Sequence, residues 1–161
     1  KGLPPLQVLD EVKSVPRRKV QHEQAEKNIA DLKERSVRGK TVWLRCNLNV
    51  PLTPDGRQVE DDHRLRVLIP TIDCLTSKGA KVLCVSHLGL LKDHPRELHS
   101  LKPVAKRLGE LMDREIIWAP SCHATKVNKM ALAGMQEGDV AVLENTLFHL
   151  GENKNDKKLA E

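Results

Sequence analysis

Short apolar runs alternate with longer stretches of mixed polarity along most of this chain. The spacing predicts strands over residues 41–47, 81–85, 115–118 and 139–143. It predicts helices over residues 61–77, 101–112 and 123–133, with a further helix beginning at residue 154. Strands that alternate with helices indicate an α/β fold. We therefore expect a three-layer, Rossmann-like parallel sheet with right-handed crossovers and helices on both faces.

The leading segment differs from the rest of the chain. Residues 1–19 hold three prolines and a basic cluster and show no stable period, whereas residues 20–35 are rich in helix formers. Of the net charge of +5, residues 1–40 carry +4, from ten Lys or Arg against six Asp or Glu. We therefore divide the chain into a basic N-terminal extension with one helix, residues 1–35, and a globular domain, residues 36–161.

A basic arm of this kind has several uses. It is compatible with RNA contact, but nothing in it is specific for RNA, and the single Phe and two Trp argue against a platform for stacking bases. A solvated tail, or a strap on a neighbouring protein, accounts for the same charges. We expect the partners to be other protein subunits.

Other classes of function find no support in the composition. The four cysteines show neither close pairing nor metal-ligand spacing along the sequence, which indicates a reduced, intracellular protein. The histidines are scattered, so we predict no metal site and no cofactor, and no apolar run has transmembrane length. The first residue is lysine, which fits a removed leader, a trimmed chain or missing residues. With a removed leader, the location would be mitochondrial or plastid.

Polar residues follow three of the predicted strands. Asn47 and Asn49 follow the first, residues 86–89 the second, and residues 144–145 the fourth. The carboxyl ends of parallel strands share one edge of the sheet, and ligands bind there in open α/β sheets. Arg64, near the start of the first crossover helix, could face the same edge. We expect any chemistry at this edge, although the two asparagines could simply stabilise their own turn and Arg64 could pair with Glu60 or Asp61.

Several segments resemble the N-terminal, acid-binding domain of phosphoglycerate kinase. They are RCNLNVPL, DDHRLRVLIPTI, KGAKVLCVSHLG, SLKPVAKRL, EGDVAVLENTLFH and GENKND, in the order of that family. The resemblance covers about three quarters of the chain and less than half of the enzyme. It implies a domain that binds 3-phosphoglycerate through a basic patch, while a separate domain, with no counterpart here, brings ATP across a hinge.

Several positions match the family's binding residues. Asn49 matches the family's asparagine, and Arg64 matches the arginine implied to stabilise the transferring phosphoryl group. His87 and Gly89 match the SHLG turn, although His87 could equally be a hydrogen-bonded structural residue. Asn47 stands where the family has aspartate. The resemblance therefore implies a remnant of a substrate site, with Arg64 as its candidate catalytic residue.

Two positions depart from the family pattern and argue against an intact substrate site. Leu90 and Leu147 stand where the family has arginine. Losing two charge-assisted hydrogen bonds would cost roughly 3–6 kcal/mol of binding free energy. We therefore expect a chain that is not itself a kinase but a structural subunit of a larger assembly, contacting partners through the extension and the former substrate edge. The alternatives are a weak phosphate-binding module and a fragment of an active phosphoglycerate kinase.

Overall fold

A four-stranded parallel sheet forms the centre of the computed structural model, which describes residues 28–89, 96–122, 130 and 132–149. The strand order is β1–β2–β4–β3, with β1 at Thr41–Arg45, β2 at Lys81–Val85, β4 at Val140–Leu143 and β3 at Ile117–Ala119. Every neighbouring pair is parallel. The predicted α/β class and the Rossmann-like sheet are therefore confirmed.

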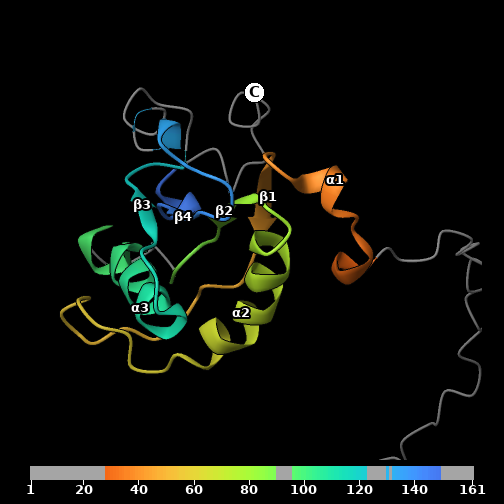
Figure 1. Ribbon diagram of the computed structural model, residues 1–161. Coiled ribbons are helices and arrows are strands. Elements are labelled where there is room, and N and C mark those ends of the chain that lie inside the picture. The colour runs from red at the N-terminus through yellow and green to blue at the C-terminus, as the bar shows by residue number, and fades with distance from the viewer. Residues whose placement is uncertain (1–27, 90–95, 123–129, 131, 150–161) are drawn as a thin grey trace, which may run out of the picture.

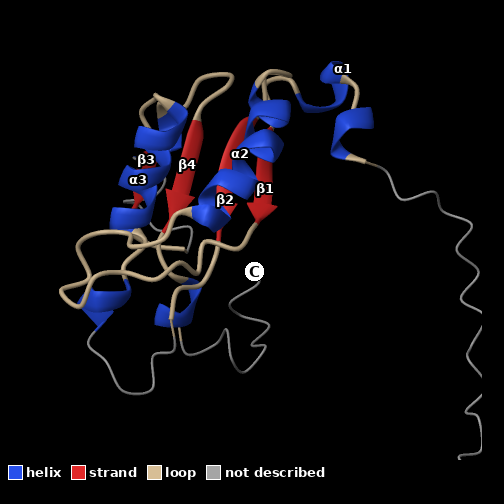
Figure 2. Ribbon diagram, turned by 90° about the horizontal axis from the view of Figure 1, so that it is seen from below, coloured by secondary structure: helices blue, strands red, loops and turns tan. Residues whose placement is uncertain are grey.

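Two helices cover one face of this sheet (Figure 1). They are α2, His63–Thr76, and α3, Lys102–Met112, which contact each other. Alternate strand residues point to opposite faces. Val82 and Cys84 of β2 therefore join the large apolar cluster beneath the helices, while Leu83 joins Met135 and Ala141 on the other face. Figure 2 shows the sheet and these two helices from below.

The shorter elements frame the sheet and its loops. Helix α1 spans Glu34–Val37. Three short 3-10 helices are also present among the described residues: η1 (Ile29–Asp31), η2 (Arg96–His99) and η3 (Thr146–Phe148). No helix within the described ranges is long and apolar enough to cross a lipid bilayer.

Within the described residues, the predicted helix over residues 20–35 is interrupted rather than continuous. Leu32 and Lys33 have extended backbone angles, with ψ of 122° and 136°, and they separate η1 from α1. Ile29 and Leu32 nevertheless pack against the main apolar cluster, so tertiary contacts override the helix propensity of this segment. The rest of that prediction, most of the helix over residues 123–133 and the helix from residue 154 lie outside the described residues. The domain boundary at residue 35 stays a prediction.

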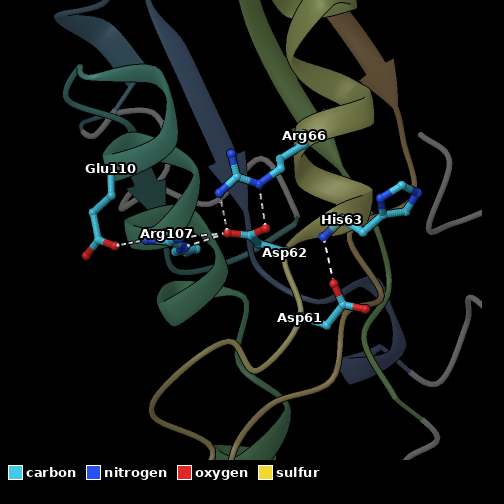
Figure 3. Close-up of polar contacts among 6 residues, drawn as sticks. All are labelled: Asp61, Asp62, His63, Arg66, Arg107 and Glu110. Atoms are coloured by element: carbon cyan, nitrogen blue, oxygen red, sulfur yellow. Dashed lines mark hydrogen bonds and ion pairs between the residues drawn. The ribbon is translucent and has the colours of Figure 1, made fainter.

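Helix α2 begins with two acidic residues that have different partners. The carboxylate of Asp61 accepts a hydrogen bond of 2.8 Å from the backbone N–H of His63, one of the N–H groups that have no partner within the helix. Asp62 makes no cap bond. It accepts instead from Arg66 of α2 at 2.7 Å and from Arg107 of α3 at 2.6 Å (Figure 3). The Asp62 carboxylate therefore joins the start of α2 to α3.

This bridge changes the acidity of the carboxyl group. The hydrogen bond from Arg66, followed by that from Arg107, lowers the pKa of Asp62 below its ordinary value. Arg107 in turn pairs with Glu110 at 2.8 Å, as Figure 3 shows. The network fixes the N-terminal turn of α2, on which Arg64 lies.

Candidate functional site

The loop after β1 folds back on itself through an asparagine side chain. The backbone N–H of Asn49 donates to Asn47 Oδ1 at 3.1 Å, while Leu48 and Val50 are buried in the core. This alternation directs apolar side chains inward and leaves polar groups at the sheet edge. Asn47 thus stabilises its own turn, as expected.

Arg64 contacts this loop from the first turn of α2. Its Nη1 atom donates to Asn47 Oδ1 at 3.2 Å and to the backbone oxygen of Asn49 at 2.6 Å. The expected pairing with Glu60 or Asp61 is therefore wrong, since both acceptors belong to the asparagine loop. Because these acceptors are neutral, the guanidinium keeps a positive charge that no carboxylate among the described residues pairs with.

The loop after β2 joins the same edge. The Ser86 hydroxyl accepts a hydrogen bond of 2.9 Å from the Leu48 backbone N–H, and the Gly89 N–H donates to Asn49 Oδ1 at 2.9 Å. Gly89 has a positive φ of 67°, and a Cβ atom there would collide with the ring of His99. Both constraints require glycine at this position.

The end of β4 holds the β2 loop in place. Asn145 is fully buried, and its side-chain Oδ1 accepts from the N–H groups of Leu88 and Leu147 at 3.2 and 3.0 Å. Its Nδ2 donates to the backbone oxygens of Leu88 and His99 at 2.8 and 3.0 Å. Neighbouring Glu144 accepts from the Leu101 N–H at 2.8 Å. Sequence reasoning placed both residues at the edge but found no role for them.

Two cavities open along this edge. One, of about 400 Å³, is lined by Asn49, Gly89 and His99 together with the proline-rich loop of residues 50–54. The other, of about 490 Å³, is lined by Cys46, Asn47, Arg64 and parts of β1 and α2. The structure thus brings four of the five predicted binding residues together, in pairs that face adjoining cavities.

The remaining predicted positions differ in their surroundings. His87 is exposed and lines neither cavity. Leu147 is half-buried in η3, with its N–H held by Asn145. Leu90 lies outside the described residues. Among the described residues, no group of three or more His, Cys, Asp and Glu side chains could hold a metal ion.

Parallel strands, a polar carboxyl edge and an arginine held by neutral oxygens define an α/β protein suited to an anionic ligand. The family model for phosphoglycerate kinase matches residues 29–161. This chain belongs to the phosphoglycerate kinase family, of which it matches the N-terminal portion.

Individual relatives agree with this assignment. The chain is 43% identical over 135 residues to a cytosolic phosphoglycerate kinase of Triticum aestivum, covering 84% of this chain and 33% of the relative. It is 36% identical over 151 residues to a chloroplastic one of Volvox carteri, covering 94% and 32%. The crystal structure of the Pyrococcus horikoshii OT3 enzyme superimposes with a TM-score of 0.63 at 31% identity, over 71% of this chain and 27% of that one.

These comparisons correct the expected function. A non-catalytic structural subunit is wrong, because these relatives are named phosphoglycerate kinase. The chain spans about one third of the length of these relatives. An intracellular location is consistent with relatives named cytosolic and chloroplastic. The finer terms of the expectation, an organelle and an assembly, gain no support.

Proposed function

We propose that this chain supplies the acid-binding part of a phosphoglycerate kinase, which transfers a phosphoryl group between ATP and 3-phosphoglycerate. The single observation that carries this proposal is the placement of Arg64. Two neutral oxygens hold its guanidinium at the carboxyl edge of the sheet, beside a cavity of about 490 Å³. A fixed, unpaired cation at this edge suits a phosphate or carboxylate ligand.

The asparagine loop has a second role in this proposal. Asn47 Oδ1 accepts from both Arg64 and the Asn49 backbone, and Asn49 Oδ1 accepts from Gly89. One set of amide groups thus sets the relative positions of α2, the β1 loop and the β2 loop. Such preorganisation lets the cation meet an anion without reorganising first.

The departures from the family pattern set the expected strength of binding. Leu147 lies in η3, directly after β4, and its side chain cannot bond an anion. One missing charge-assisted hydrogen bond costs roughly 1.5–3 kcal/mol of binding free energy, which raises the dissociation constant about ten- to hundred-fold. We expect this chain to bind 3-phosphoglycerate weakly, with Arg64 as its principal cation among the described residues.

Titration calorimetry with 3-phosphoglycerate tests the proposal. Arg64→Gln should abolish the binding heat, while Leu147→Arg should lower the dissociation constant ten- to hundred-fold. Arg57→Gln is the matched control, because the Arg57 side chain is 83% exposed, pairs only loosely with Asp55 at 3.9 Å and lines neither edge cavity. Unchanged affinity in both Arg64→Gln and Leu147→Arg would refute the proposed site.

The location and the partners stay predictions. They are a mitochondrial or plastid location, and protein partners that contact the basic extension and the former substrate edge. Of the extension, residues 1–27 lie outside the described residues.

A further inference from the structure

Two of the four cysteines are neighbours in the fold: Cys46, directly after β1, and Cys84, within β2. Leu44 pairs with Cys84 in the parallel register, so Cys46, two residues further on, has its side chain on the same face of the sheet. The Cys46 N–H donates to the Val85 oxygen at 3.1 Å, and its thiol lies 3.9 Å from the same atom. Both cysteines pack into the apolar cluster beneath α2. The fold thus makes neighbours of two cysteines that are distant along the sequence.

The two thiols have unequal surroundings. Cys46 is half-buried and lines the cavity that also contains Asn47 and Arg64, whereas Cys84 is completely buried. A hydrogen bond from the Cys84 thiol lowers the pKa of Cys46, while the interaction with Cys46 and burial raise the pKa of Cys84. The accessible thiol is thus the one that loses its proton more readily, and the thiolate is the reactive form.

We propose that Cys46 and Cys84 are an oxidisable dithiol beside the ligand edge, with a hydroperoxide as the oxidant. The Cys46 thiolate attacks the outer peroxide oxygen; an S–O bond forms, the O–O bond breaks, and the departing alkoxide or hydroxide takes a proton from water. The Cys84 sulfur then attacks the sulfenic sulfur of Cys46. The S–S bond forms as the S–O bond breaks, and the hydroxide leaves as water with the Cys84 proton. The two thiols together supply the two electrons that reduce the peroxide.

Closing this bridge moves the end of β1. A spacing of about 4.8 Å between strands and a rise of about 3.3 Å per residue place the two Cα atoms roughly 8 Å apart. A disulfide needs about 4.4–6.8 Å, so Cys46 must approach β2. Within the described sheet, β1 is an edge strand, paired with β2 alone over Thr41–Arg45, so the approach requires the hydrogen bond from the Cys46 N–H to the Val85 oxygen to break. Cys46 directly precedes Asn47, whose side chain holds Arg64, so oxidation displaces the cation of the site.

Peptide mapping by mass spectrometry tests the chemistry. The full chain is treated with hydrogen peroxide, denatured, alkylated with iodoacetamide and digested. We expect two of the four thiols to be lost, with a mass decrease of about 2 Da and a bridge that joins the Cys46 and Cys84 peptides. Cys84→Ala should leave Cys46 as a sulfenic acid that dimedone traps, and Cys74→Ala, the matched control, should form the bridge as the unmodified chain does.

Three results would overturn the dithiol. They are four unreacted thiols, a bridge that involves Cys74 or Cys122, and a Cys46 sulfenic acid that persists in the unmodified chain. All three are read from the unmodified chain, so the test stands even where Cys84→Ala fails to fold.

A nitrogen–proton correlation spectrum tests the structural consequence, which matters for binding only if the proposed function holds. Oxidation should shift the side-chain amide signals of Asn47 and the backbone signal of Asn49, and dithiothreitol should reverse both shifts. A bridge that leaves these signals in place would overturn the coupling to the site. Because neither measurement uses 3-phosphoglycerate, failure of this proposal and failure of the proposed function are distinguishable.

Discussion

Replacing Asn145 by alanine should destabilise the chain strongly. The Asn145 side chain is fully buried and makes four hydrogen bonds, two accepted from backbone N–H groups and two donated to backbone oxygens. At about 1 kcal/mol net for each bond, the loss is about 4 kcal/mol. Small domains have only about 5–15 kcal/mol of stability, so the variant should lie close to unfolding.

Urea denaturation followed by circular dichroism measures this loss. Asn28→Ala is the matched control, because Asn28 is exposed and its side chain accepts one bond of 3.0 Å from the Ala30 N–H. We expect about 1 kcal/mol or less for that variant. A loss below about 1 kcal/mol for Asn145→Ala, at an unchanged slope against urea, would refute the reasoning, because water would then satisfy the four groups equally well.

Two further changes test the edge and the bridge between helices. Gly89→Ala should lower the free energy of unfolding by about 1–2 kcal/mol or more, because φ is +67° and the added Cβ would collide with an imidazole ring; Gly134→Ala, where a Cβ would meet open space, should be nearly neutral in the same urea titration. The depressed pKa of Asp62 means that the bonds from Arg66 and Arg107 stabilise the fold above the ordinary carboxyl pKa, and that this stabilisation is lost as the pH falls through the lower folded value. Asp62→Asn should remove that part of the acid dependence, and identical pH profiles of the free energy of unfolding for variant and unmodified chain would contradict the bridge.

Much of the fold could be predicted from local patterns. The apolar runs gave β2 and β4 nearly to the residue, and the spacing of leucine and isoleucine gave α2 and α3, because burial on one face imposes those periods. The extended backbone at Leu32 and Lys33 could not be foreseen, since helix propensity is a weak signal that tertiary packing, here of Ile29 and Leu32 against the core, overrides.

The contacts of the site depended on register, which the sequence pattern does not reveal. The polar loops were correctly placed at one edge because parallel strands end together. Which groups meet there follows from strand pairing: Arg64 reaches the asparagine loop 15 and 17 residues away, and Cys46 meets Cys84 across two strands. The Asp62 bridge to Arg107, 45 residues along the chain, likewise needs the packing of α2 on α3.

The expected function was wrong for a related reason. It rested chiefly on Leu90 and Leu147, with the basic leading segment and the lack of a nucleotide-binding domain in this chain as further arguments, whereas the family match extends over residues 29–161. Two substitutions change the strength of a site by an amount that physical chemistry can estimate, but they do not by themselves assign the protein to a different class.

Turnover by the full gene product that contains this chain tests the central claim most directly. The assay supplies ATP and 3-phosphoglycerate and measures the ADP formed. We predict turnover that Arg64→Gln lowers by about 10²–10³-fold, because a preorganised cation stabilises charge in the transition state. Absence of turnover, or turnover that Arg64→Gln leaves unchanged, would contradict the account.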